Sequence, residues 1–132
     1  VASGPFGYGQ EYAELVDLNR LGAITVKGIC PEEHVGNATP RTFETRGGMI
    51  NAIGLPGPGT KGFLEKYVPF LKEFNTPVIV NIWGKAMEDY SRVVEQLDAE
   101  DTVSAYEINL SFEEFFSDGG SSVFCTCPTR RH

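Results

Sequence analysis

The chain has 132 residues, of which 41% are hydrophobic and 22% charged, and its formal net charge is −7. This length fits one domain with a hydrophobic core and is too short for a complete (β/α)8 barrel of about 250 residues. The acidic balance argues against a nucleic-acid partner, because such a partner requires a basic face. No apolar run reaches the length of a transmembrane helix, so no membrane partner is expected.

The cysteines indicate a reducing environment. Cys30, Cys125 and Cys127 are too few for a disulfide framework and odd in number. The first residues also lack the basic and apolar regions of a signal peptide, so we expect a cytoplasmic location. Cys125 and Cys127 supply at most two of the four ligands of a structural zinc, and we predict no metal site.

Regular elements are predicted first in the N-terminal half. Apolar residues on one side of residues 11–18 predict a short helix, and the β-branched run 21–26 predicts a buried strand. A loop rich in glycine and proline is expected over 28–59. Helical spacing resumes over 63–74, where Pro69 should kink or shorten the helix.

The C-terminal half alternates strand and helix. The nearly continuous apolar run 78–83 is typical of a strand buried on both faces in a parallel sheet. Residues 86–97 form an amphipathic helical stripe, and 105–110 predict a further strand. The predicted fold class is therefore α/β, built from parallel β/α units with right-handed crossovers.

Polar residues fall at or near the carboxyl ends of the predicted strands. Lys27 follows the first strand, Asn81 lies within the second, and Asn109 lies near the end of the third. Ligands of α/β folds bind at this edge of the sheet. One such asparagine is often a satisfied buried amide, but three polar residues on successive strands predict a ligand site.

Short motifs over about residues 1–111 occur in the order and spacing of a known family. They are Ala2-Ser3-Gly4, Asp17-Leu18-Asn19-Arg20-Leu21-Gly22-Ala23, Val26-Lys27-Gly28, Gly48-Met49-Ile50-Asn51-Ala52-Ile53-Gly54-Leu55, Pro77-Val78-Ile79-Val80-Asn81-Ile82 and Glu107-Ile108-Asn109-Leu110-Ser111. The chain resembles the N-terminal half of class 1 dihydroorotate dehydrogenase catalytic subunits, and most closely those of subclass 1B.

The resemblance implies the first half of a TIM (β/α)8 barrel that binds FMN. It implies a single domain over 1–132 that contains the first four barrel strands and ends in a divergent tail over 112–132. The implied reaction is the oxidation of dihydroorotate to orotate in pyrimidine biosynthesis. Subclass 1B further implies a partner subunit with FAD and an iron–sulfur cluster that passes electrons to NAD, and we expect a homo-oligomer.

The resemblance also assigns roles to individual residues. The residues expected to contact the cofactor are Ala2, Ser3, Gly4, Lys27, Asn81 and Asn109. The residues expected to contact the substrate are Lys27, Asn51, Ile53, Gly54, Leu55 and Asn109. Amide side chains suit a flat diamide ring because each both donates and accepts hydrogen bonds, and an ammonium group stabilises developing negative charge.

The catalytic base departs from the family pattern. The position of the family's cysteine holds Phe112, which has no ionisable group and cannot remove a proton. Ser111 is adjacent, but neighbouring side chains of an extended segment point to opposite faces. The family's loop persists in outline around Gly119-Gly120, which favours a local sequence error over genuine divergence.

Two alternative functions remain open from the sequence. One is a small non-catalytic α/β domain, which would have to protect two open sheet edges. The other is a related FMN-dependent enzyme that oxidises or reduces a pyrimidine. Because the family's later strands supply a second lysine and a phosphate-binding glycine loop, we expect these 132 residues alone neither to hold flavin tightly nor to turn over.

Overall fold

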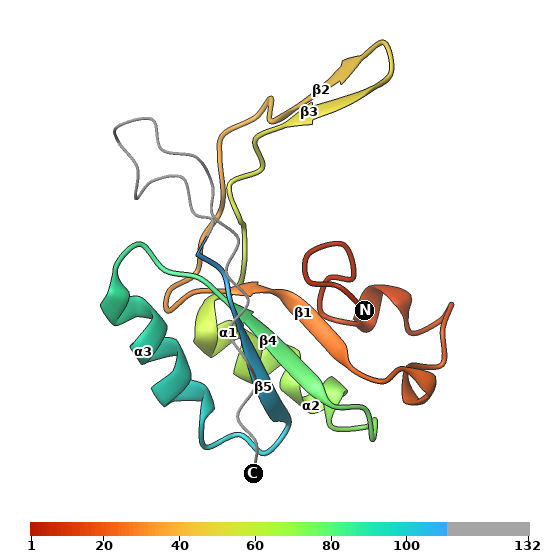
Figure 1. Cartoon of the computed structure of the whole chain (residues 1–132), viewed down its shortest axis with the longest axis vertical. Helices are drawn as coiled ribbons and strands as arrows, with labels where there is room; N and C mark the ends of the chain where they lie inside the picture. Colours follow the sequence, from red (N-terminus) through yellow and green to blue (C-terminus); the bar gives the residue numbers. More distant parts are fainter. Residues whose placement is uncertain (111–132) are drawn as a thin grey trace.

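The computed structural model describes residues 1–110 and contains a three-stranded parallel sheet (Figure 1). Its strands are β1 (Ile24–Ile29), β4 (Val78–Ile82) and β5 (Val103–Ile108), in the spatial order β1-β4-β5. The predicted parallel β/α units are confirmed, with each strand's end within three residues of its expected position. Four barrel strands are expected in the whole chain, and residues 1–110 contain three parallel strands.

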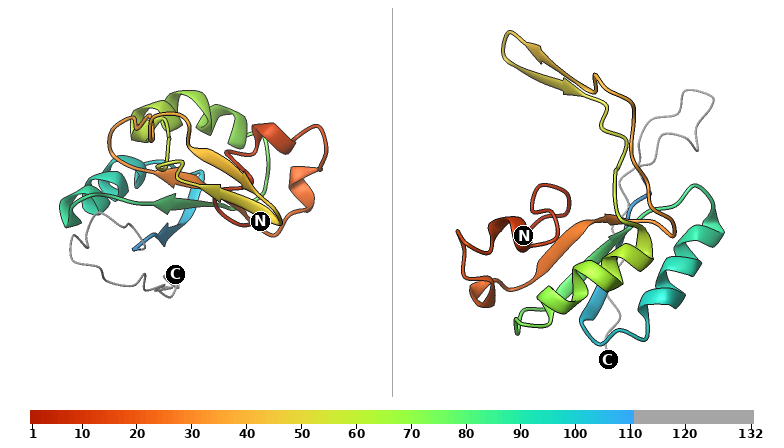
Figure 2. Two further views of the ribbon diagram at one scale, coloured as in Figure 1. Left: turned by 90° about the horizontal axis from the view of Figure 1, so that it is seen from above. Right: turned by 180° about the vertical axis from the view of Figure 1, so that it is seen from behind.

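Helices cover one face of this sheet. They are α1 (Gly59–Lys66), α2 (Val68–Leu71) and α3 (Met87–Leu97), and Figure 2 shows α1 and α2 above the sheet. Pro69 lies in the first turn of α2, where its missing N–H costs no hydrogen bond. The expected interruption of the helix is confirmed, and the break falls at Tyr67.

The core lies between the helices and alternate strand residues. Ile24 and Val26 of β1 and Val80 of β4 are fully buried, and they pack with Phe63 of α1 and Val93 of α3. Successive residues of a strand point to opposite faces, so Asn81 lies on the face away from these helices. The helices therefore leave the opposite face of the sheet to the polar residues.

The expected loop over 28–59 contains a hairpin. Strands β2 (Thr42–Thr45) and β3 (Gly48–Asn51) pair antiparallel around Arg46-Gly47 and extend away from the sheet (Figure 1). The loop prediction was wrong here because Phe43 opposite Ile50 is an aromatic and β-branched cross-strand pair, which favours strands. Both side chains are largely exposed.

The helix predicted over 11–18 was also wrong. The structure has 3-10 turns over η1 (Gln10–Tyr12) and η2 (Leu18–Arg20) instead. So short a segment does not sustain a helix without packing, and Leu15, expected on the buried stripe, is 78% exposed. The Tyr12 ring stacks on Phe6 with centroids 4.7 Å apart, so this aromatic side chain is packed without a helix.

The sheet has two open edges in the described part of the chain, at β1 and β5, as expected for part of a barrel. Among residues 1–110 there is no helix long and apolar enough to span a bilayer.

The packing predicts a contrast between two isoleucines. Ile24→Ala removes a fully buried side chain from the core, so we expect the free energy of unfolding to fall by about 2–5 kcal/mol. Ile50→Ala, on the hairpin at 65% exposure, should change it by less than about 0.5 kcal/mol. Urea unfolding followed by circular dichroism measures both. Equal losses would contradict this description of the core.

Candidate cofactor- and substrate-binding site

The N-terminal segment crosses the sheet near the strand ends. The Ser3 hydroxyl donates to the Glu107 carboxylate of β5 at 2.5 Å, and the Gly7 carbonyl accepts from the Lys27 backbone N–H of β1 at 2.8 Å. Because β4 lies between β1 and β5, residues 3–7 span all three strands. The structure thus brings Ser3, predicted to contact the cofactor, to the strands that carry Lys27 and Asn81.

Asn81 and Glu107 are directly opposed in the β4–β5 ladder. The Asn81 Nδ2 donates to Glu107 Oε1 at 2.5 Å, so the same oxygen accepts from both Ser3 and Asn81. Asn81 is only 7% exposed, and this hydrogen bond replaces the contact with water that its Nδ2 loses on burial. Sequence reasoning missed Glu107; its position two residues before Asn109 on the same strand face was the available signal.

A β-bulge shapes the end of β1. The pairs Val26–Val80 and Ile29–Ile82 leave two β1 residues opposite the single residue Asn81. Those two residues are Lys27 and Gly28. Bulges re-aim side chains next to functional sites, and this one places the backbone of Gly28 against Asn81.

Gly28 is required for space rather than for its conformation. A Cβ built on it would lie 2.9 Å from Asn81 Oδ1 and 2.8 Å from Cδ1 of Trp83, closer than real Cβ contacts. The sequence placed Gly28 at the start of a loop, whereas it belongs to β1. The absent side chain is what allows Asn81 and Trp83 to occupy this end of the sheet.

Lys27 lies within β1 rather than after it, and it is half-buried. Its backbone N–H is held by Gly7, but within residues 1–110 no hydrogen bond or ion pair engages its ammonium group. Strands fix its main chain while its charge remains available to a ligand. The contacts of Lys27 with cofactor and substrate stay a prediction.

Asn109 directly follows β5 and is held by its backbone. Its N–H donates to the Ile82 carbonyl at 2.9 Å, and its carbonyl accepts from the Tyr90 hydroxyl of α3 at 2.8 Å. Burial raises the pKa of Tyr90, which keeps this donor protonated. The predicted position of Asn109 at the strand end is therefore confirmed.

The predicted substrate residues Asn51, Ile53, Gly54 and Leu55 lie where the hairpin returns to the sheet. Gly54 and Leu55 both have positive φ, at 79° and 47°, and the Ile53 carbonyl accepts from the Asn37 N–H at 3.0 Å. No hydrogen bond within the described chain joins Asn51 to a polar side chain of the sheet. The returning segment approaches the site at Gly57, where an added Cβ would lie 3.1 Å from the Gly28 carbonyl.

Of the remaining predicted residues, Ala2 and Gly4 flank Ser3 on the exposed N-terminal segment. Gly4 has φ 89°, which favours glycine, and no atom lies within 4 Å of a Cβ built there. Ser111 and Phe112 lie outside the described residues, as do Cys125 and Cys127.

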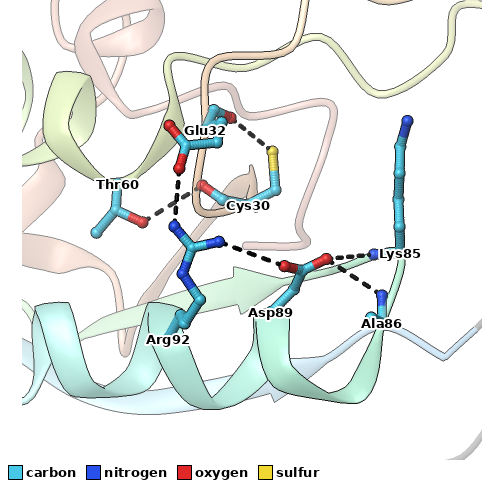
Figure 3. Close-up of polar contacts among 7 residues, drawn as sticks. All are labelled: Cys30, Glu32, Thr60, Lys85, Ala86, Asp89 and Arg92. Carbon is cyan, nitrogen blue, oxygen red and sulfur yellow. Dashed lines mark hydrogen bonds and ion pairs between the residues drawn. The ribbon is translucent and has the colours of Figure 1, made fainter.

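A second polar cluster connects the loops after β1 and β4 (Figure 3). The Asp89 carboxylate accepts from the backbone N–H groups of Lys85 and Ala86 at 2.9 and 3.1 Å, which caps the start of α3. Arg92 bridges Asp89 and Glu32, at 3.7 and 2.8 Å. These contacts fix the two loops relative to α3.

A cavity of about 230 Å³ lies beside this cluster, lined by Cys30, Pro31, Glu32, Glu33, His34, Trp83, Gly84, Lys85 and Asp89. None of the predicted site residues lines it. The Cys30 thiol is buried and donates to the Glu32 carbonyl at 2.9 Å, and burial followed by the charge of Asp89 raises its pKa to about 11. The part of the chain that the structure describes has no group of three or more metal-ligating side chains.

The fold and these side chains define the class of protein. Parallel strands covered by helices, with polar groups gathered at the carboxyl ends, are typical of (β/α) barrels that bind a ligand at that end. A family model described as dihydroorotate dehydrogenase matches residues 1–114, and the chain belongs to this family. The predicted resemblance and the TIM-barrel fold class are confirmed.

Individual relatives agree with the family. The chain is similar to "Dihydroorotate dehydrogenase B (NAD(+)), catalytic subunit" from three bacteria. It is 53% identical to that of Alkaliphilus metalliredigens over 110 residues, covering 83% of this chain and 36% of the relative. It is 52% identical to the Geobacter sulfurreducens subunit over 127 residues, which cover 96% of this chain and 41% of the relative. It is 48% identical to the Listeria welshimeri subunit over 131 residues, which cover 99% of this chain and 42% of the relative. The chain thus spans about two fifths of the relatives it matches.

The close approach at Gly28 predicts a specific sensitivity. In Gly28→Ala the new methyl group must displace Asn81 or Trp83, so we expect a loss of about 1–3 kcal/mol in the free energy of unfolding. Trp83 is the only tryptophan, so its fluorescence spectrum should shift as well. Gly22→Ala is the matched control, because nothing lies within 4 Å of a Cβ built there. Similar spectra for all three chains would contradict the packing.

Cys30 should be a slow nucleophile. In a chain with Cys125→Ser and Cys127→Ser only this thiol reacts, and a pKa of about 11 leaves roughly one thiol in a thousand ionised at pH 8. The rate of reaction with iodoacetamide should rise about tenfold per pH unit from pH 8 to 10. The same chain unfolded in guanidinium is the control and should react far faster at pH 8. Equal rates in the two states would refute burial as the cause.

Proposed function

We propose that this chain forms the first part of the FMN-binding barrel of a dihydroorotate dehydrogenase B catalytic subunit. The observation that carries the proposal is the gathering of Lys27, Asn81 and Asn109 at one end of a parallel sheet in a chain about half identical to such subunits. The proposed domain extends over 1–132 and includes 112–132 as a divergent tail.

The described residues fit a flat, partly anionic cofactor. Gly4 presents backbone without a side chain, and the Lys27 ammonium group has no hydrogen-bond or ion-pair partner within residues 1–110. In this proposal Ala2, Ser3 and Gly4 lie against the FMN ring, and Lys27, Asn81 and Asn109 bind its polar edge. Glycine permits the close contact that a ring stacked on backbone needs.

The substrate is proposed to be dihydroorotate, with orotate as product. Asn51 would hydrogen-bond the pyrimidine ring, and Ile53, Gly54 and Leu55 would offer backbone groups. Bound FMN supplies the acceptor for the hydride that leaves the ring. Lys27 would then stabilise negative charge that develops on the substrate.

The proposed partners follow from the names of the relatives, which are catalytic subunits of a NAD-linked B-type enzyme. We propose an electron-transfer subunit with FAD and an iron–sulfur cluster as the partner, and a homo-oligomer of the catalytic subunit. A cytoplasmic location remains a prediction from the cysteine content.

Phe112 favours one alternative, a non-catalytic α/β domain, because it cannot accept the proton that dihydroorotate loses. Peptide mass spectrometry separates this reading from a local sequence error. A peptide containing Phe112-Glu113-Glu114 would exclude the error. A related FMN-dependent enzyme acting on another pyrimidine is the other alternative, and steady-state assays with uracil and dihydrouracil test it.

A graft tests the proposed function. Residues 1–110 replace the matching segment of the Geobacter sulfurreducens subunit, which then supplies the rest of the barrel. We expect the graft to retain FMN, seen by its absorbance, and to form orotate from dihydroorotate. Lys27→Met in the graft should lower kcat/KM by about 100-fold or more, because it removes a charged donor from the reacting centre.

A longer graft, through residue 114, tests the base position. It should bind FMN but lose turnover by about 100-fold or more, and Phe112→Cys should restore activity. Circular dichroism controls for folding in every graft. A folded 1–110 graft without FMN would contradict the proposed function.

A further inference from the structure

Glu107 is the point where three separate segments meet at the site. Its Oε1 accepts the Ser3 hydroxyl from the N-terminal segment and the Asn81 amide from β4, both at 2.5 Å. The carboxylate itself is on β5. None of the sequence predictions assigned Glu107 a role, although it contacts two residues predicted to bind the cofactor.

The carboxylate determines which way the Asn81 amide faces. An ionised carboxylate only accepts hydrogen bonds, so it must face the Nδ2 of Asn81 and not the Oδ1. The Oδ1 is then turned toward Gly28, where it lies 2.9 Å from the position that a Cβ would take. With a glycine there, this oxygen faces the Gly28 backbone beside the Trp83 ring, whose Cδ1 lies 2.8 Å from the same Cβ position.

The same reasoning applies to Ser3. A hydroxyl has one hydrogen and two lone pairs, and the Ser3 hydrogen is donated in the hydrogen bond to Glu107. Ser3 can therefore act only as an acceptor toward a further group. Both side chains that contact Glu107 are left with accepting oxygens.

We propose that Glu107 is a positioning and specificity-determining residue of this site. It orients Asn81 and Ser3 so that both present acceptors, and it selects a ligand with an N–H donor, such as the imide of a flavin or pyrimidine ring. It also anchors the N-terminal segment across the sheet. The inference rests on the proposed function for the identity of the ligand, but not for the orientation of the side chains.

The first test needs no ligand and uses the full 132-residue chain. Glu107→Met keeps the side-chain length but removes both hydrogen bonds. We expect the Asn81 Nδ2 proton resonances to lose their hydrogen-bond shift, and exchange of the Gly7 and Lys27 amide protons, which hold the N-terminal segment, to quicken about tenfold. Glu107→Gln should retain most of both signals, because its Oε1 can still accept. Glu95→Gln, exposed on α3, is the matched control. Unchanged signals in Glu107→Met would overturn the proposal.

The second test measures ligand selectivity by NMR titration of the same chains, where weak binding is still measurable. One arm compares FMN with 3-methyl-FMN, and the other compares orotate with 3-methylorotate, so that the source of the imide is distinguished. In the wild-type chain N-methylation should weaken binding about tenfold for the ligand that occupies the site. Glu107→Met should reduce that ratio to about threefold or less, and Glu107→Gln should largely preserve it.

The outcomes separate the two proposals. Equal selectivity in wild type and Glu107→Met overturns the specificity role. The proposed function fails if neither FMN nor orotate binds the wild-type chain and neither of them binds a folded graft. The ligand-free resonances and exchange rates still decide whether Glu107 positions Asn81 and Ser3.

Discussion

The parallel ladder through β4 is the constraint on which both the core and the site depend. Val80 pairs with Val26 on one side and Tyr106 on the other, which directs the apolar residues of the three strands toward the helices. Strand alternation then commits Asn81 and its partner Glu107 to the opposite face. A shift of one residue in this register would exchange the two faces, so a single ladder fixes the core and the polar site together.

Much of the fold could be predicted from the sequence because its signals are local. The run 78–83 and the stripe 86–97 differ from β4 and α3 by one residue at an end. The errors arose where tertiary contacts decide. β1 continues through Lys27 and Gly28 because the ladder with β4 and its bulge accommodate them. The segment before β1 forms 3-10 turns because so short a stretch does not sustain an α-helix.

The candidate site was predictable in its residue types but not in its connections. Lys27, Asn81 and Asn109 could be identified because each lies at or near the carboxyl end of a predicted strand. Glu107 shares its strand face with Asn109, but its role could not be identified, since that role comes from hydrogen bonds to Ser3 and Asn81, 104 and 26 positions away. The need for Gly28 is likewise set by side chains of another strand. Such long-range pairings leave no periodic pattern in the sequence.

The unequal spacing of the strands along the chain has a consequence for the order of folding. Ile24 pairs with Val78, 54 positions later, whereas Val78 pairs with Val103 only 25 positions later. Doubling a loop adds about 0.6 kcal/mol of closure entropy, and more local contacts form sooner. We therefore expect the unit from β4 to β5 to form first. Asn81 and Glu107 meet within it, and Lys27 arrives later with β1, so the site is assembled from its amide and carboxylate side first.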